Sequence, residues 1–295
     1  MIFNCKTITP MFMSGADGKT HKPRPPSIKG VMRFWWRAVQ AEGELCELKK
    51  NEAAIFGSSD TGRSKVAIRA VATLSHQNIK VLTHRDDEIY GKTDSKGKIK
   101  KSVNDEGFHI GQKLEIRLNL TNEVKLTNGI NFDDKMLGWL FKLTILLGGL
   151  GGRSRRGYGS IMIVEQAFIS INKVIVNIDK LLNNLKPGYY KNERSAIKIT
   201  KEPEQKEYPY IEKVEIGAQY NSYDELLKQI KKASSDYNDD ALGYARNEKR
   251  LASPIYVSVV EISNKYHPVV TTLHNNANNK NVASFKKCIL ERKCE

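Results

Sequence analysis

The sequence lacks the features that mark secreted, membrane-spanning and zinc-binding proteins. Its four cysteines (Cys5, Cys46, Cys288 and Cys294) form no CxxC pair, which argues against a zinc site and a dense disulfide framework. No apolar stretch of about 18 residues is free of charge, so we expect no transmembrane span. The first ten residues lack the apolar core of a secretory signal. The sequence therefore predicts a cytoplasmic protein that is not held in a membrane.

Signatures of catalysis are also scarce. The six histidines show no HExxH or comparable ligand spacing, and no GxSxG nucleophile motif is present. The aromatic RNA-binding signature of RRM domains is absent as well, which directs any RNA contact to loops and helices instead of a sheet face. We therefore expect no metal, no cofactor and no catalytic residue.

Positive charge is what the sequence has in excess. The 295 residues include 48 Lys and Arg against 33 Asp and Glu, a formal net charge of +15. Residues 1–170 hold 27 basic and 17 acidic residues, so most of the excess lies there. Such charge favours a polyanionic partner, either nucleic acid or an acidic membrane surface. The length, about twice the ~150 residues of a typical domain, predicts two domains.

The first half has the pattern of a known α+β unit. Alternating or β-rich segments predict strands at 1–8, 65–74, 113–120 and 160–164. Helical periodicity predicts one helix that begins with Ser27 as its cap, and a buried helix over 132–147. This order predicts a ferredoxin-like (RRM-like) domain, an antiparallel sheet with both helices packed on one face.

Residues 171–295 resemble a looser second version of the same fold. A capping box of Ser222 and Glu225 predicts a helix start, strands follow at 254–262 and 267–273, and a helix lies near 282–291. We therefore expect two ferredoxin-like domains, 1–170 with a glycine-rich loop and 171–295. Residues 84–111, rich in Asp, Lys, Ser and Gly, predict an exposed hairpin or mobile loop.

One face of the helix after Ser27 carries a candidate RNA site. Spacings of three, four and seven place Lys29, Arg33 and Trp36 on one stripe, with Arg37 beside them. Lys19 adds charge in the preceding loop. A flat aromatic ring among cations suits single-stranded nucleic acid, because a base stacks while phosphates are paired. The alternative is that Trp36 packs under a loop or partner subunit and the cations form a solvated face.

A second candidate is the glycine-rich segment 148–159. Six glycines allow close approach to a phosphate, Arg153, Arg155 and Arg156 supply bidentate donors, and Tyr158 can stack on a base. The segment follows a helix and precedes a strand, unlike a nucleotide-cofactor loop. The alternative is an ordinary helix C-cap turn with disordered arginines.

The loop between the first strand and the first helix holds two polar residues that could take part in chemistry. His21 could act as a general base toward an RNA 2′-hydroxyl, and Asp17 could orient a water or a hydrated metal. Simple solvation is the more frequent role of such residues in a polar loop.

Several of these segments resemble one known family. The runs 9–18, 24–37 and 55–58, the glycine-rich loop 148–159 and the Arg-Leu-Ala-Ser-Pro run 250–254 resemble the RAMP superfamily. Within it they are similar to the first subunits of type III-B CRISPR (Cmr) effector complexes. That resemblance implies two ferredoxin-like domains in a ribonucleoprotein that contacts the 3′ portion of the guide RNA (crRNA), the paired target RNA and neighbouring RAMP subunits.

The resemblance also bears on catalysis. In this family target cleavage is assigned to the repeated backbone subunit, which carries an Asp in the loop after its first strand. Asp17 lies in a comparable loop, yet proteins resembling this subunit are regarded as non-cleaving, so no catalytic role is transferred to it. The resulting hypothesis is a non-catalytic RNA-binding subunit in antiviral defence. The alternatives are a metal-independent RAMP endoribonuclease that uses His21, or a scaffold that binds only protein.

Overall fold

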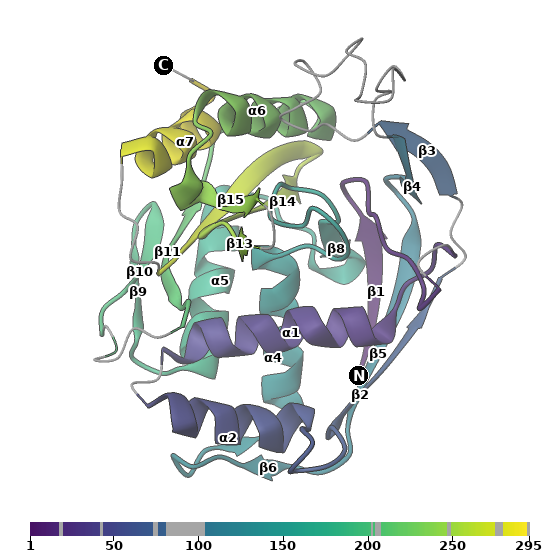
Figure 1. Cartoon of the computed structure of the whole chain (residues 1–295), viewed down its shortest axis with the longest axis vertical. Helices are drawn as coiled ribbons and strands as arrows, with labels where there is room; N and C mark the ends of the chain where they lie inside the picture. Colours follow the sequence, from purple (N-terminus) through teal and green to yellow (C-terminus); the bar gives the residue numbers. More distant parts are fainter. Residues whose placement is uncertain are drawn as a thin grey trace.

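The first half of the chain forms a four-stranded antiparallel sheet in the order β2-β5-β1-β8 (Figure 1). The computed structural model describes residues 1–17, 20–41, 44–72, 76–80, 104–201, 203, 208–246, 249–274 and 280–293. The strands of this sheet are β1 (Ile2–Thr7), β2 (Val66–Val71), β5 (Lys113–Leu120) and β8 (Ile161–Ile163). Two helices, α1 (Pro25–Gln40) and α4 (Asp134–Leu147), pack on one face. This is the predicted β-α-β-β-α-β unit.

The second half forms a five-stranded antiparallel sheet in the order β14-β15-β11-β10-β9. Its strands are β9 (Tyr190–Glu193), β10 (Ala196–Ile199), β11 (Ile211–Ile216), β14 (Ile255–Ile262) and β15 (Lys265–Leu273). From β11 onward the chain repeats the order of the first half, through α6 (Tyr223–Asp236), β14, β15 and α7 (Lys280–Glu291). The place beside β11 that a closing fourth strand would take is occupied by β10, which comes earlier in the sequence.

Helix α4 lies between the two sheets, which explains why it is apolar on all sides. It contacts β5 and β8 of the first sheet and β14 and β15 of the second. Helix α5 (Ile171–Leu185) packs beside α4 and against β9 and β10. Alternate side chains of β14 point to opposite faces, so that Tyr256 and Val260 meet the α4 side while Val257 and Val259 meet α6 and α7. The cores of the two halves are therefore continuous.

Other elements extend the first sheet unit. Helix α2 (Leu45–Phe56) packs against α1, and three small ladders pair the remaining strands of the described residues. These strands are β3 (His76–Lys80) with β4 (Asn104–Phe108), β6 (Val124–Lys125) with β7 (Asn131–Phe132), and β12 (Tyr244–Arg246) with β13 (Lys249–Leu251). Two short 3₁₀ turns are η1 (Val164–Gln166) and η2 (Asp240–Leu242). Strand β4 lies within the segment 84–111, for which an exposed hairpin or mobile loop was predicted, but its partner β3 precedes that segment. Residues 84–103 lie outside the described residues.

Helix starts show one correction and two additions to the sequence predictions. Helix α1 begins at Pro25, with Arg24 as its extended cap residue, so the expectation that Ser27 caps it is wrong. Prolines at the first two positions are preorganised for a helix and need no amide donor there. Helices α2 and α5 were not predicted. The α6 start was predicted correctly, because the Ser222 side chain accepts a hydrogen bond from the Glu225 amide.

Candidate nucleic-acid interface

A cationic groove of about 780 Å³ lies between the first half of α1 and the start of β2. Lys29 and Arg33 line it from α1, and Arg63 and Lys65 line it from the segment that leads into β2. No carboxylate belongs to this lining, among the residues that the structure describes. An open surface with four cations is suited to neutralising the phosphates of a nucleic acid backbone. We call this surface the α1/β2 groove.

The two sides of the groove are held by different parts of the backbone. Lys29 and Arg33 are one helical turn apart, so they lie on the same face of α1. On the other side, the Lys65 amide donates to the Ile55 carbonyl at 2.9 Å, and the Lys65 carbonyl accepts from the Thr121 amide at 2.9 Å. The groove therefore joins residues that are more than thirty positions apart in sequence, which is why Arg63 and Lys65 were not predicted.

The floor of the groove is flat at Gly30. A Cβ atom added there would meet no other atom within 4 Å, so packing does not require a glycine at this position. A glycine inside a helix costs about 0.5–1 kcal/mol relative to alanine. Beside it, burial lowers the pKa of the Lys29 ammonium from its ordinary value. A cation that is partly desolvated favours an anion in the groove.

Arg33 and Arg37 share one carboxylate. The Arg33 Nε and an Arg37 terminal nitrogen both donate to Oε1 of Glu52, which α2 holds against α1. The Glu52 side chain is only 7% exposed, whereas both arginines are more than one-third exposed. One carboxylate cannot neutralise two guanidinium groups, so this cluster keeps a net positive charge beside the groove. The predicted cations are thus present, but two of them are fixed by a partner that the sequence pattern did not reveal.

The expectation that Trp36 offers its ring to a base is wrong. Trp36 is 1% exposed, and its ring packs edge-on toward Phe56 of α2 at 6.4 Å between centres. As in the alternative, Trp36 is a packed residue, but the element that covers it is helix α2 and not a loop or a partner subunit. Helix α2 covers this side of α1, so the aromatic member of the stripe is buried while its charged members reach the edge of the contact.

The glycine-rich loop packs between the two halves of the chain and makes hydrogen bonds to both. Gly152 donates its amide to the Phe12 carbonyl at 2.7 Å, and Gly157 donates to the Val257 carbonyl of β14 at 2.8 Å. A Cβ atom at Gly151 (φ +87°) would lie 2.2 Å from the Phe12 carbonyl oxygen. Glycine is therefore required at this position for two reasons. It permits the close contact between the two backbone segments, and it adopts the left-handed conformation without steric cost.

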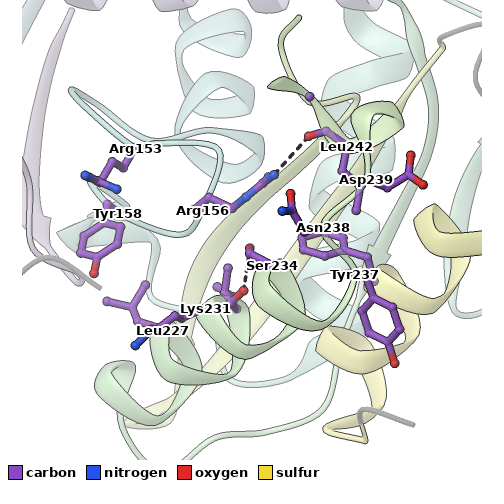
Figure 2. A pocket seen from close by; sticks show the side chains of 13 residues that line it. Arg153, Arg156, Tyr158, Leu227, Lys231, Ser234, Tyr237, Asn238, Asp239 and Leu242 are labelled. Carbon is purple, nitrogen blue, oxygen red and sulfur yellow. Dashed lines mark hydrogen bonds between the residues drawn. The ribbon is translucent and has the colours of Figure 1, made fainter. Parts of the chain in front are cut away.

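Arg155 and Arg156 point into the protein from this loop. The Arg155 guanidinium lies against the rings of Phe34 and Tyr256 and donates to the Ser253 carbonyl. Arg156 donates to the Ile255 carbonyl at 3.2 Å. It also donates to the Leu242 carbonyl at 3.4 Å (Figure 2). Burial, with the neighbouring Arg155 charge, lowers the pKa of Arg156 to about 10. These two arginines hold β14 and η2 against the loop, and the alternative of disordered arginines is wrong for them.

The remaining predicted residues have mixed positions. Tyr158 is 3% exposed, and the centre of its ring lies 5.3 Å from the centre of the Phe12 ring, so the expectation that it stacks on a base is wrong. Arg153 is exposed at the end of the loop, in a left-handed conformation. Lys19 lies outside the described residues.

Both polar residues of the loop after β1 make local structural contacts. The His21 ring meets Phe108 edge-on at 6.3 Å, and its Nδ1 atom is buried. The Asp17 carboxylate accepts hydrogen bonds from the amide and hydroxyl of Thr20, which closes the turn. No group of three or more His, Cys, Asp or Glu that could hold a metal ion occurs among the residues described by the structure.

A family model matches the part of the chain that contains the α1/β2 groove. The model of the RAMP superfamily matches residues 4–162, which is more than half of the chain and contains every cation of the α1/β2 groove. The chain belongs to the RAMP superfamily. The resemblance of the sequence to the RAMP superfamily is thereby confirmed.

Two relatives of this RAMP chain come from Pyrococcus furiosus. The CRISPR system Cmr subunit Cmr1-2 is 31% identical over 184 residues, which cover 55% of this chain and 94% of that protein. The Cmr subunit Cmr1-1 is 26% identical over 311 aligned positions, covering 85% of this chain and 83% of that protein. Similarity to these subunits thus extends beyond the first sheet of the RAMP chain.

Solved structures show that the fold is shared along almost the whole RAMP chain. The apo crystal structure of Cmr1 from Pyrococcus furiosus matches with a TM-score of 0.57 and 21% identity, over 98% of this chain and 95% of that chain. A cryo-EM structure of the type III-B Cmr-β complex bound to cognate target RNA matches with a TM-score of 0.59 and 13% identity, over 98% and 97%. Among the described helices of the RAMP chain, none is long and apolar enough to cross a membrane.

Proposed function

We propose that this RAMP chain is a non-catalytic RNA-binding subunit of a type III-B CRISPR (Cmr) interference complex, located in the cytoplasm. The α1/β2 groove tracks the phosphates of the guide RNA, near its 3′ portion, or of the paired target RNA. Neighbouring RAMP subunits and the two RNAs are its partners. The observation that carries the proposal is a groove lined by Lys29, Arg33, Arg63 and Lys65, with no carboxylate among its described lining residues, in a chain of net charge +15.

The positions of two residues support a binding role over catalysis. The His21 ring contacts Phe108 edge-on, and the Asp17 carboxylate accepts from the Thr20 hydroxyl, so both side chains take part in local packing or turn formation. We also propose residues 1–170 and 171–295 as the two domains. This division falls at Ser170, whose side chain caps α5.

Charge reversal in the groove tests the proposal. Lys29→Glu with Arg63→Glu should lower the affinity of the purified protein for single-stranded RNA by about tenfold or more, because two phosphate contacts become repulsive. The matched control is Lys173→Glu with Lys180→Glu, which reverses two exposed lysines on α5, outside the groove. Filter binding on both variants measures the difference. Equal losses in both variants would reduce the effect to net charge and contradict the proposal.

A variant that adds bulk without changing charge gives an independent check. Gly30→Leu places a side chain in open space on the groove floor and raises the helix propensity of α1. RNA affinity should fall while the melting temperature stays the same or rises. Unchanged RNA affinity would show that RNA does not enter the groove.

A further inference from the structure

A second cavity lies between the two halves of the chain, apart from the α1/β2 groove. It has a volume of about 260 Å³. One wall is the glycine-rich loop, and the other is the C-terminal part of α6 with residues 238–243 (Figure 2). Phe285 of α7 also lines the cavity. Ligand pockets of drug-sized molecules have about 300–1,000 Å³, so this cavity suits a smaller ligand.

Arg156 supplies a buried positive charge to this cavity. Its guanidinium lies 5.1 Å from the centre of the Phe285 ring and is oriented by the carbonyls of Leu242, Ile255 and Arg155. Among the described residues, no carboxylate forms an ion pair with it. A largely buried cation that the described residues hold through neutral acceptors keeps its full charge for an anion in the adjacent cavity.

Two more cations line the cavity, against one carboxylate. Arg153 comes from the glycine-rich loop and Lys231 from α6. The carboxylate is Asp239, which accepts hydrogen bonds from the Ala241 amide and from Asn281, both at 2.8 Å. Figure 2 shows the Asp239 carboxylate directed away from Arg156. The cavity is therefore electropositive on the side of Arg156.

The other lining groups suit the remaining parts of a nucleotide. Leu227 and Ile230 form an apolar wall, which can cover the face of a base. Ser234 and Asn238 add a hydroxyl and an amide that can bond to a sugar or to the base edge. Phosphate, sugar and base thus each have a matching surface in one cavity of limited size.

We propose that this cavity between the glycine-rich loop and α6 binds one nucleoside monophosphate, with its phosphate at Arg156, Arg153 and Lys231 and its base against Leu227 and Ile230. The ligand is either a free mononucleotide or the phosphorylated terminal nucleotide of an RNA strand. Both sources present the same phosphate monoester chemistry. The site differs from the α1/β2 groove, which is open and suits an internal stretch of backbone.

Calorimetric titration of the full-length protein with AMP, adenosine and inorganic phosphate tests the site. AMP should bind about tenfold or more tightly than adenosine, because a charge-assisted contact to phosphate is worth at least ~1.4 kcal/mol. Lys231→Glu and Ser234→Phe should each weaken AMP binding by about tenfold or more, through lost charge and through filling of the cavity. AMP and adenosine of equal affinity, or no binding of AMP, would overturn the proposal.

Neighbouring residues on α6 provide matched controls. Lys232→Glu and Ser235→Phe repeat both substitutions one position along the helix, where the side chains are exposed and do not line the cavity. Both should leave AMP affinity within about twofold of the wild type. If the control variants weaken AMP binding as much as Lys231→Glu and Ser234→Phe do, the ligand binds elsewhere and the proposal is wrong.

RNA probes distinguish the two sources of the ligand and separate this site from the groove. An oligonucleotide with a terminal phosphate that binds more tightly than its dephosphorylated form, and loses this advantage in Ser234→Phe, identifies a strand end. Equal affinity of both forms, with AMP binding retained, identifies a free mononucleotide. Lys29→Glu with Arg63→Glu should leave AMP binding unchanged. RNA affinity therefore tests the α1/β2 groove, and AMP affinity tests the cavity independently of it.

Discussion

The guanidinium carbon of Arg155 lies 5.2 Å from the centre of the Tyr256 ring, and 5.3 Å from that of Phe34 on α1. The contact joins the glycine-rich loop, the first helix and β14 of the second sheet. Ser154 strengthens it, because its hydroxyl lies 2.6 Å from the Tyr256 hydroxyl. An arginine that composition alone assigns to RNA is thus part of the interface between the two halves of the protein.

This position predicts a stability effect for Arg155→Ala. The variant loses two cation–π contacts and leaves the Ser253 carbonyl without its donor, so the free energy of unfolding should fall by about 2–3 kcal/mol. The salt dependence of RNA binding should stay the same. Urea unfolding and RNA titrations at several salt concentrations measure both quantities. A variant of normal stability with a reduced salt dependence would instead place Arg155 on phosphate.

Glu52 should affect stability and RNA binding in opposite directions. Glu52→Gln removes the carboxylate that Arg33 and Arg37 share, so the free energy of unfolding should fall by about 2 kcal/mol. The same change adds one positive charge beside the α1/β2 groove, and RNA affinity at low salt should rise by about two- to fivefold. Thermal unfolding and filter binding test the pair of effects. Glu47→Gln on the exposed face of α2 is the control, and an RNA affinity that rises equally there would contradict a local effect.

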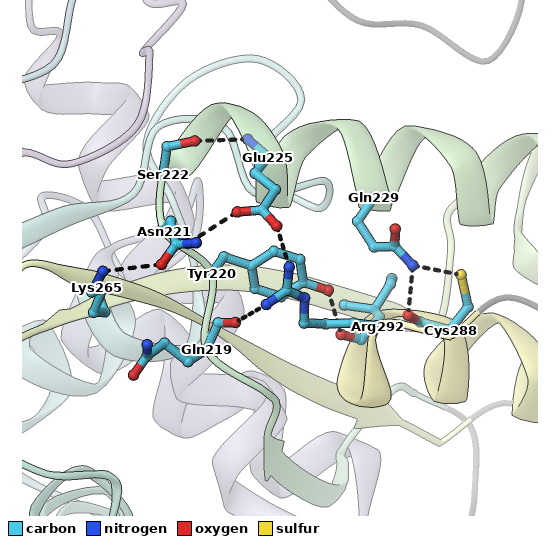
Figure 3. A network of polar contacts seen from close by, with 10 residues as sticks. Gln219, Tyr220, Asn221, Ser222, Glu225, Gln229, Lys265, Cys288 and Arg292 are labelled. Atoms are coloured by element: carbon cyan, nitrogen blue, oxygen red, sulfur yellow. Dashed lines mark hydrogen bonds and ion pairs between the residues drawn. The ribbon is translucent and has the colours of Figure 1, made fainter.

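The C-terminal end of α7 is tied to the start of α6 through Arg292. Its guanidinium donates to the Gln219 carbonyl at 2.7 Å, pairs with Glu225 and lies 4.7 Å from the centre of the Tyr220 ring (Figure 3). Glu225 in turn accepts from the Asn221 amide at 3.0 Å.

Arg292→Ala should lower the free energy of unfolding by about 1–2 kcal/mol, because several contacts are lost together. A double-mutant cycle with Glu225→Gln measures the coupling, which we expect at about 0.5–1 kcal/mol. The exposed pair Asp224–Lys228 on the same helix is the reference, with a coupling no greater than about 0.5 kcal/mol. Equal coupling free energies in the two pairs would show that the Arg292–Glu225 pair stabilises the protein no more than an ordinary exposed ion pair does.

Local patterns were sufficient to predict much of the fold. Residues 113–120 alternate strictly and form β5 with the predicted bounds, and the capping box at Ser222 starts α6. The all-round apolar character of 132–147 indicated burial, which α4 has because it lies between two sheets. Each of these signals resides in the segment that it describes, so a single sequence is enough.

The candidate site was predicted only in part, because its other members come from distant segments. Lys29 and Arg33 were identified from helical spacing, whereas Arg63 reaches the groove through the packing of α1 on β2. The burial of Trp36 depends on α2, which has no strong local signal. Arg155 depends on β14, about one hundred residues later in the chain. Long-range packing, which periodicity does not encode, therefore decides which basic residues remain available for RNA.

The salt dependence of RNA binding tests the central claim most directly. For single-stranded RNA, the slope of log affinity against log salt changes by about 0.7 for each phosphate contact. Lys29→Ala with Arg63→Ala should therefore reduce the magnitude of the slope by about 1.4, relative to the wild type and to Lys173→Ala with Lys180→Ala. A slope that stays equal in all three proteins would contradict a phosphate-binding role for the α1/β2 groove.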